Sequence, residues 1–518
     1  MLKNREILGR NCFDEITNPK QLFEFESAGI LCVSHSYNAQ WSGRHLGLCK
    51  ENLSIYNSSS LELIAHIDFL RFPINDVDYD EKKQLLLIAT GSYDGGWSYE
   101  GELYAYDFIT KRLIKLLDDN REFTFCRFEG NQIEIKVLPP DDTDEKLYLK
   151  TYLIKLLLNV RQKLQDFEPI EITSYPEGEF NFESSQEKLK VLSLRLSSLA
   201  NKNGFEYEPC SMAWDLKFID DGSLFIGFAN GTVGILKLAT DELITKKIVA
   251  SGDFSQIFKG VNQESLYVNL FTYKVDNDEY NTVFKIDNTL TKWEKVTAGI
   301  FSLSQSLNGH FLARQADWKD KKRNDILFDE FFNKITECRL GHYDLFNHYI
   351  RIDGEEHFCA LLGTPNSQHQ NKKLIELSST DMRPLSEITL ELQPEHYNNL
   401  NAIKVGGRYV IEAKVYNPNP RINAHVVMAF NCNGEKLWTK NISAQASGMT
   451  KIESCPDKVA LSLINGEFII LDSLTGRVTL KLSKNEEING YPLSISNNGN
   501  KIAIGYDNGL IELIELEK

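Results

Sequence analysis

The stretch GELYAYDFITKRLIKLL at residues 101–117 has the same pattern as GTVGILKLATDELITKKI at 231–248 and GEFIILDSLTGRVTLKL at 466–482. Each copy is a strand with alternating apolar and polar residues, then a polar turn, then a second alternating strand. A phrase that recurs about every 40 to 50 residues is typical of the blades of a propeller, in which each blade is one small sheet. These phrases therefore predict an all-β propeller.

Each phrase follows an inner pair of strands, such as DLKFIDDGSLFIGF at 215–228 or LSISNNGNKIAIGY at 493–506. The DDG and NNG turns inside these pairs have the chemistry of hairpins. Four strands in meander order make one blade, and we count about ten such units. Their third strands begin near Leu53, Leu103, Leu147, Val233, Val283, Ile326, Leu374, Val427, Phe468 and Leu510.

One region interrupts the repeat. Residues 1–165 hold about three units, residues 166–209 hold no clean copy of the phrase, and residues 210–518 hold seven further units. The interruption is an irregular insertion or a degenerate blade. Within it, residues 186–200 are compatible with a helix or an inner strand, and the alternation at 188–196 slightly favours a strand. One large ring, or a seven-bladed ring with N-terminal blades, both fit this organisation.

The two ends of the chain complement each other. The last unit ends with GLIELIELEK at 509–518 and lacks a fourth strand, whereas KNREIL at 3–8 is a strand-like segment with no unit before it. We therefore expect the N-terminal strand to close the ring by completing the last blade.

Composition excludes several classes of protein. Hydrophobic residues make up 42% and charged residues 25% of the 518 residues, and no apolar run is long enough to span a membrane. The net charge of −16 disfavours nucleic acid and anionic membranes as partners. The nine cysteines form no CxxC pair, and the first residues do not resemble a secretory signal. We expect free thiols in a reducing cytoplasm.

The turn phrase carries a family resemblance. The order "strand, Asp, turn, Thr-Gly, strand" at 470–477 resembles the third-to-fourth strand junction of WD-repeat and quinoprotein-like propellers. The segment 433–438, NGEKLW, is similar to the Gly-x-x-x-Trp of the quinoprotein type and puts Trp438 at the docking position. No unit has the Gly-His and Trp-Asp of orthodox WD repeats. The resemblance implies the architecture and leaves the function open.

Two neighbouring units share the pattern S-Y-x-x-x-W-S between their second and third strands. It holds Tyr37 and Trp41 in the first unit and Tyr93 and Trp97 in the next. Exposed Tyr and Trp suit recognition because they bury a large area at a small cost in conformational entropy. The alternative is that these aromatic residues pack on one another and only stabilise long loops.

Other connections at the same position are also long and polar. They are 273–281, 315–325, 364–373 and 416–423, and the second of these holds Trp318 and Arg323. Their charges are mixed, acidic at 276–279 and basic at 319–323, which suits a protein partner better than a nucleic acid. Length concentrated on one face indicates a binding face. Drift in unconstrained loops is the alternative.

No catalytic motif, metal-binding spacing or cofactor fingerprint occurs in the sequence. We therefore predict a non-catalytic scaffold that binds a protein or peptide through Tyr37, Trp41, Tyr93, Trp97, Trp318 and Arg323, without metal or cofactor. The alternative is an enzyme or small-molecule binder with its site at the channel mouth, for which Asp94, His45 and Arg314 are candidates. The oligomeric state and the partner's identity are not encoded in these patterns.

Overall fold

A computed structural model describes residues 2–9, 12–38, 49–93, 99–119, 121–138, 147–154, 168–170, 182–204, 212–229, 231–249, 253–261, 265–274, 279–299, 301–315, 324–340, 351–352, 355–362, 373–389, 397–415 and 424–517. Within these residues the strands form ten antiparallel sheets of four strands each. The predicted β-propeller architecture of about ten four-stranded units is confirmed.

The chain divides into two compact units. One unit contains the first three sheets and helix α2 (Phe182–Lys202). Blade 1 is β2 (Asn18–Phe25), β3 (Ile30–Asn38), β4 (Cys49–Asn57) and β5 (Leu63–Leu70); blade 2 is β6 (Ile74–Asp80), β7 (Leu85–Tyr93), β8 (Tyr99–Asp107) and β9 (Arg112–Asp119); blade 3 is β10 (Phe123–Glu129), β11 (Gln132–Val137), β12 (Leu147–Leu153) and β13 (Glu168–Ile170).

The other unit contains the remaining seven sheets. Blade 4 is β14 (Ala213–Asp220), β15 (Ser223–Phe228), β16 (Thr232–Lys237) and β17 (Glu242–Lys247); blade 5 is β18 (Asp253–Lys259), β19 (Ser265–Lys274), β20 (Glu279–Asp287) and β21 (Trp293–Gly299); blade 6 is β22 (Phe301–Gln305), β23 (Phe311–Gln315), β24 (Asp325–Phe328) and β25 (Lys334–Cys338); blade 7 is β26 (Arg351–Ile352), β27 (Phe358–Leu362), β28 (Lys373–Leu377) and β29 (Pro384–Thr389). Blade 8 is β30 (Tyr397–Val405), β31 (Arg408–Val415), β32 (Ala424–Phe430) and β33 (Lys436–Ile442); blade 9 is β34 (Ala446–Ile452), β35 (Cys455–Leu463), β36 (Phe468–Asp472) and β37 (Val478–Leu482); blade 10 is β38 (Pro492–Asn498), β39 (Lys501–Tyr506), β40 (Ile511–Leu516) and β1 (Leu2–Leu8). The domain limits drawn from the sequence, 1–165, 166–209 and 210–518, stay a prediction.

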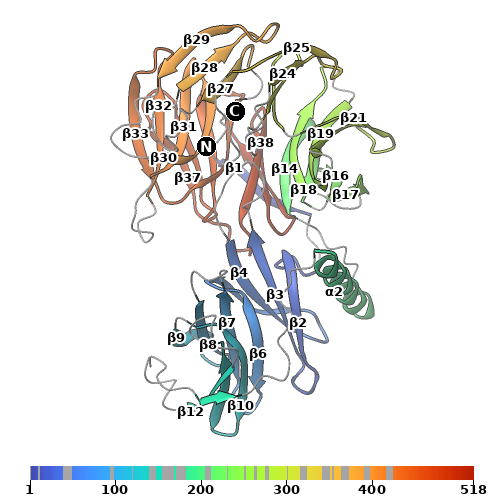
Figure 1. Ribbon diagram of the computed structural model, residues 1–518, viewed down its shortest axis with the longest axis vertical. Helices are drawn as coiled ribbons and strands as arrows, with labels where there is room; N and C mark the ends of the chain where they lie inside the picture. The colour runs from blue at the N-terminus through green and yellow to red at the C-terminus, as the bar shows by residue number, and fades with distance from the viewer. Residues whose placement is uncertain are drawn as a thin grey trace. The chain divides into compact units, whose positions relative to one another are not determined.

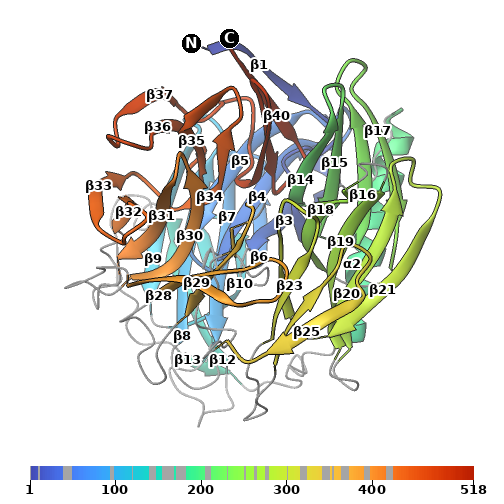
Figure 2. The same ribbon diagram turned by 90° about the horizontal axis from the view of Figure 1, so that it is seen from above.

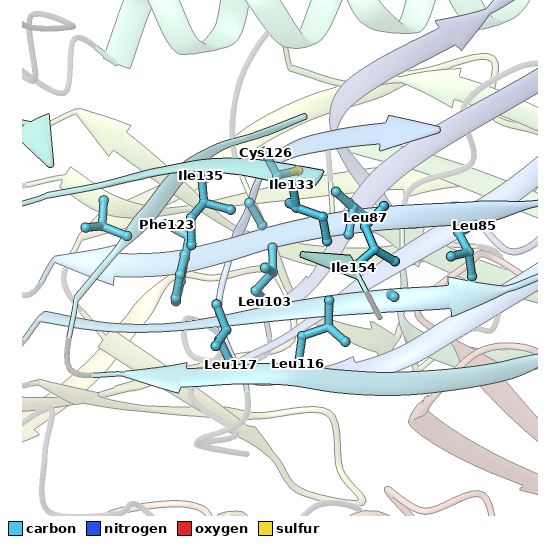
Figure 3. Close-up of a cluster of buried hydrophobic side chains, with 13 residues drawn as sticks. Leu85, Leu87, Leu103, Leu116, Leu117, Phe123, Cys126, Ile133, Ile135 and Ile154 are labelled. Carbon is cyan, nitrogen blue, oxygen red and sulfur yellow. The ribbon is translucent and has the colours of Figure 1, made fainter. Parts of the chain in front are cut away.

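The sheets pack through buried aliphatic faces. Between blades 2 and 3, side chains of β7, β8 and β9 meet those of β10 and β11 in one cluster that includes Leu87, Leu103, Phe123 and Ile135 (Figure 3). All four are fully buried. Burying such side chains contributes about 1.5–3 kcal/mol each to the free energy of folding. A lone four-stranded sheet has no second sheet to pack against and lacks this stabilisation.

Helix α2 covers the free face of blade 1 (Figure 1). Leu196 and Ala200 are buried against Leu31 and Val33, with Leu192 and Leu199 beside them. These four positions follow the spacing of one helix face, so the slight preference for a strand at 188–196 is wrong. The alternation of a short window misled because Val191 and Leu194 are exposed apolar residues on the opposite face.

A recurrent irregularity joins neighbouring sheets. Near the start of the innermost strand the pairing register shifts by a residue in eight of the ten described sheets. In five of these sheets the side chain just after the shift bonds to the innermost strand of the next sheet or to the residue beside it. Asp76 accepts from the Cys126 N–H at 3.0 Å, and Asp215 accepts from the Ile257 N–H at 2.8 Å. Gln21, Gln256 and Ser494 make the equivalent bonds to Ile74, Leu303 and Ala213.

These bonds, called staples below, also join the last sheet to the first one of the seven-blade unit. The Ser494 hydroxyl in β38 donates to the Ala213 carbonyl in β14 at 2.8 Å. Asn498 of blade 10 donates to Asp221 of blade 4 at the other end of the same strands. Blades 4 to 10 therefore follow one another in a ring.

The turn between the third and fourth strands is nearly constant. A side chain at its start, such as Asp107 or Asp472, accepts hydrogen bonds from two backbone N–H groups of the turn. A residue with positive φ then ends the turn in eight sheets: Leu61, Lys111, Asp241, Leu290, Phe332, Met382, Gly434 and Gly476. This is the phrase read from the sequence. Trp438 of blade 8 donates from Nε1 to the Ser473 carbonyl in the turn of blade 9, as its docking position implies.

The N-terminal strand β1 pairs antiparallel with β40 and is the outer strand of blade 10 (Figure 2). Leu8 is buried, Arg5 Nε lies 2.5 Å from Glu512 Oε1, and Lys3 pairs with Glu515 at the exposed edge. That this strand holds the ring closed stays a prediction.

Deleting residues 1–8 should lower the melting temperature by roughly 5 °C or more, because β40 would lose its outer partner and Glu512 its cation. Differential scanning calorimetry measures this. The Lys3→Ala variant, which removes only an exposed ion pair, is the control and should melt within about 1 °C of the parent. An unchanged melting temperature for the deletion would refute the closing role of β1.

Replacing Asp215 by Ala should destabilise the ring unit by about 1–3 kcal/mol, because it orphans the buried N–H of Ile257. Urea unfolding followed by tryptophan fluorescence gives the value. Glu242→Ala, an exposed substitution on the outer strand of the same blade, should change the free energy of unfolding by less than about 0.5 kcal/mol. Equal effects of the two substitutions would show that the staple contributes nothing.

Candidate functional site

The long connections lie at one end of the sheets. In a four-stranded meander, the second-to-third strand connection lies at the opposite end from the two other turns. In the ring unit this connection is short in blades 4, 9 and 10, where it spans 229–231, 464–467 and 507–510. In blades 6, 7 and 8 it spans 316–324, 363–372 and 416–423, and blade 5 extends its hairpin with the long strands β19 and β20. Blades 6 to 8 thus carry long connections, and blade 5, whose connection spans only 275–278, adds long hairpin strands beside them; we call blades 5 to 8 the loop-bearing sector.

The residues predicted to bind belong to second-to-third strand connections or to the strand residues that precede them. Tyr37 is in β3 of blade 1 and Tyr93 is in β7 of blade 2, next to the connection in each case. Their side chains, together with Trp41, Trp97, Trp318 and Arg323, lie outside the described residues, as do Asp94 and His45. Trp318 and Arg323 belong to the connection of blade 6 in the ring unit. The binding role of all six residues stays a prediction.

In blade 1 a hydrogen-bonded chain runs from Thr17, just before β2, across β3, β4 and β5. The Thr17 N–H lies 3.3 Å from His35 Nδ1, His35 Nε2 lies 2.9 Å from Ser54 Oγ, and that hydroxyl lies 3.0 Å from His66 Nδ1. An N–H donated to Nδ1 fixes the His35 proton on Nε2, so the chain runs from Thr17 towards His66. Burial, with His66 close by, lowers the pKa of His35 and keeps its ring neutral.

Ser54 and His35 are in hydrogen-bond contact, as a nucleophile and its base would be, but the His35 nitrogen that faces Ser54 carries the proton and cannot take another. Ser54 and His35 are also fully buried, so no substrate carbonyl can reach the hydroxyl. The chain therefore orients the strand ends from which the connection leaves. The sequence signal for this hydrogen-bonded chain was the polar run Ser34-His35-Ser36 inside a buried strand. A search for metal-ligand spacing does not find such a run.

Blade 2 holds a buried carboxylate at the same level. Glu102 is 1% exposed, Lys115 Nζ lies 2.5 Å from its Oε1, and the Tyr104 hydroxyl donates to its Oε2. Thr90 on the neighbouring strand donates to the Glu102 carbonyl at 2.9 Å. Both carboxylate oxygens are therefore occupied by donors of the same sheet.

The loop-bearing sector of the ring repeats this arrangement with long polar side chains. In blade 8, Glu412 is fully buried and accepts from Asn401 at 2.9 Å and from the Ala446 N–H of blade 9 at 3.3 Å, with His425 Nδ1 3.7 Å away. Burial raises the pKa of the Glu412 carboxyl, and its hydrogen bonds oppose that rise. In blade 5, Asn269 donates to Gln256 and accepts from Asn281.

Blade 6 places an ion pair there. Arg314 is fully buried, and its Nε lies 3.4 Å from Asp325 Oδ1. The other carboxylate oxygen of Asp325 accepts from the Leu340 N–H at 3.1 Å. Arg314 was a candidate for an enzymatic channel mouth. Its enclosure in the sheet gives it a role in holding the first residues of β24 beside β23.

These groups share one property: they are enclosed and engaged with neighbouring strands. Their hydrogen bonds and ion pairs go to neighbouring strands and can hold the strand ends next to the connections in fixed positions. Within the described residues no group of three His, Cys, Asp or Glu side chains is arranged to hold a metal ion. In that part of the chain, no helix has the length and apolar character needed to cross a membrane.

Comparison with known proteins places the chain by fold. No protein-family model and no curated protein matches the sequence. Among solved structures, hydrazine synthase of Kuenenia stuttgartiensis aligns with a TM-score of 0.47 and 11% identity, over 60% of this chain and 97% of the other. The WD40 β-propeller domain of Doa1 gives 0.43 and 11%, over 60% and 95%. Virginiamycin B lyase of Staphylococcus aureus gives 0.44 and 9%, over 60% and 96%. Likeness at this level concerns the fold alone, and the propeller architecture rests on the ten sheets themselves.

Blade 10 carries a buried acid at the loop end of the ring. Asp507 lies in the short connection after β39, accepts from the Tyr491 N–H at 2.7 Å, and is fully buried. Burial raises the pKa of its carboxyl from 3.8 to about 7. The folded protein therefore keeps a proton that the unfolded chain releases above pH 4, and stability falls as the pH rises towards 7.

Asp507→Asn should remove this dependence, since the amide keeps the acceptor and carries no charge. The variant should gain stability over the parent between pH 4.5 and 7.5, by at most about 4 kcal/mol at about 1.4 kcal/mol per pKa unit. Urea unfolding at pH 4.5, 6 and 7.5 measures the difference. A constant difference between the two proteins across this range would contradict a raised pKa at Asp507.

Proposed function

We propose that this protein is a non-catalytic interaction scaffold whose ring binds a protein or peptide partner at the loop-bearing sector. The observation that carries the proposal is the grouping of the long connections on blades 6 to 8 beside the long hairpin strands of blade 5, while blades 4, 9 and 10 close with short turns. Drift in unconstrained loops would affect all seven blades alike. Restriction to consecutive blades instead defines one continuous area, as binding through loops on a rigid scaffold requires.

The engaged polar side chains beneath the loops support the same function. Glu412, Arg314 and Asn269 fix the strand ends by internal contacts. A fixed loop root lowers the entropy lost when a loop binds, so affinity is gained without new contacts. A cytoplasmic location and the absence of a cofactor remain predictions from the sequence.

The partner would use the mixed charges of the loops. Acidic residues at 276–279 and basic residues at 319–323 offer both signs within the sector. Such a surface selects a partner by charge pattern and suits a folded protein or peptide better than a polyanion. The net charge of −16 over the whole chain also disfavours binding of nucleic acid, because it repels a polyanion.

The test compares matched variants in the ring. Trp318→Ala with Arg323→Ala should weaken binding of a captured and then purified partner by at least about tenfold, as loss of a Trp and an Arg contact does in interfaces. Leu474→Ala with Arg477→Ala changes an exposed apolar residue and an exposed arginine on the third-to-fourth strand turn of blade 9. This control should bind as the parent does. Partners that bind all three proteins equally would refute the proposal.

The aromatic loops of the other unit require their own variant. Replacing Tyr37, Trp41, Tyr93 and Trp97 together by Ala should remove partners that need blades 1 and 2, with unchanged melting temperature. Capture by the parent and by this variant, compared by quantitative mass spectrometry and repeated with purified partners, separates the two units. Identical partner sets would assign these aromatic residues to loop packing.

A further inference from the structure

Three exposed apolar side chains lie at the opposite end of the ring from the long connections. Val261 follows β18, Leu307 lies between β22 and β23, and Phe331 lies between β24 and β25. Their exposed fractions are 57%, 68% and 63%. All three are in turns of the adjacent blades 5 and 6, at the end where the first-to-second and third-to-fourth strand turns lie.

The three turns touch one another at Gly309. A side chain at Gly309 would collide with a Val261 methyl group and would come within 3.2 Å of Glu330 Cβ. Gly309 also has a φ of 84°, which favours glycine. The turn that carries Leu307 therefore packs between the turn that carries Val261 and the turn that carries Phe331. We call these three side chains the turn patch.

The turn patch is rigid. Phe332 has a positive φ and stacks on Phe311 with ring centroids 4.3 Å apart, so its neighbour Phe331 faces solvent. The Phe331 N–H donates to Asp329 at 2.9 Å, and the Leu307 N–H donates to the Glu355 carbonyl of blade 7 at 2.9 Å. Since the backbone is already fixed, little ordering entropy would be lost when a partner covers these side chains.

Equivalent turns elsewhere do not gather apolar residues. The first-to-second strand turns hold Asp221 and Gly222 in blade 4, Gly406 and Gly407 in blade 8, and Gly499 and Asn500 in blade 10. Ile109 and Leu474 are exposed in single turns of blades 2 and 9. Single exposed apolar residues are ordinary on a protein surface, whereas a contiguous group marks an interaction site.

The border of the turn patch is acidic. Glu330 precedes Phe331, and its side chain is 37% exposed with Oε2 3.7 Å from His310 Nε2. Glu356 is exposed next to Glu355, whose carbonyl holds Leu307. Lys259, two residues before Val261, is half buried. Two other lysines near the patch are each paired with an acid, Lys334 with Glu337 at 2.7 Å and Lys451 with Glu355 at 3.0 Å. A partner with basic residues beside apolar ones is therefore complementary to this surface.

We propose that Val261, Leu307 and Phe331, bordered by Glu330, form a docking site for a protein segment that presents apolar side chains next to Lys or Arg. This site is separate from the loop-bearing sector, because it lies at the other end of the same sheets. The inference does not rest on the proposed function. Together the two sites would let one ring hold two partners at once.

The experiment uses the full chain and synthetic peptides of defined chemistry. One labelled set has a Leu-x-x-Phe core flanked by Lys, a second set has Glu in place of Lys, and a third has Ser in place of Leu and Phe. Fluorescence anisotropy should show binding of the Lys-flanked apolar set only. Absence of binding by that set, or equal binding of the Glu-flanked set, would overturn the proposal.

Variants then locate the site. Leu307→Ser with Phe331→Ser should raise the Kd of the Lys-flanked set by at least about tenfold, and Glu330→Gln should raise it by about threefold and reduce its salt dependence. The matched control, Ile109→Ser with Leu474→Ser, changes equally exposed turn residues elsewhere and should leave the Kd unchanged. Equal Kd values for the turn-patch variant and the parent would overturn the proposal.

Sedimentation of the parent and the turn-patch variant addresses self-association. A concentration-dependent dimer of the parent that the Leu307→Ser, Phe331→Ser variant abolishes would assign the surface to a second copy of the chain and overturn the proposal. The substituted side chains are exposed, so an unchanged melting temperature is expected and loss of binding reports the contact itself.

Discussion

The staples between innermost strands are the constraint on which the ring depends. A four-stranded sheet twists, and two twisted sheets touch over a limited area unless something fixes their spacing. In blades 4, 5 and 10 the register shift near the start of the innermost strand turns one polar side chain towards the next sheet, where it bonds to backbone. Asp215, Gln256 and Ser494 satisfy buried donors or acceptors in this way. Apolar packing provides most of the stabilisation between neighbouring sheets, and the staples fix how their innermost strands are aligned.

The two units show two ways to protect the faces of small sheets. In the ring unit every sheet has two neighbours, because blade 10 meets blade 4. In the other unit the three sheets form a row, and the amphipathic helix α2 covers the free face of blade 1 with Leu196 and Ala200. On β11, Glu134 and Lys136 alternate with Ile133 and Ile135, which pack against blade 2, so the two charged residues lie on the opposite face of blade 3. Terminal repeats in stacked proteins are capped in the same manner, by a polar face or by an added element.

Much of the fold was readable because the strands obey a period of two and the turns obey local chemistry. The phrase at 466–482 predicted β36, its turn and β37, and the docking of Trp438 followed from its spacing to Gly434. Helix α2 was one of two alternatives for 186–200, and the slight preference for a strand was wrong because its apolar residues are too numerous for a clear period within nine positions. The polar chain through His35 and Ser54 was missed because its members lie on separate strands of one blade, and only the pairing register of those strands brings them side by side.

The pairing of β1 with β40 makes blade 10 the most non-local sheet of the chain. Lys3 and Glu515, which face each other across these strands, are 512 positions apart in the sequence. Contacts over such separations form late, because the loop they close must first be organised by nearer contacts. Blades 4 to 9 can each assemble from one continuous segment, whereas blade 10 needs both ends of the chain. Completion of blade 10 therefore requires residues 2–8 and 492–516 together, so loss of either segment would expose an unpaired strand edge.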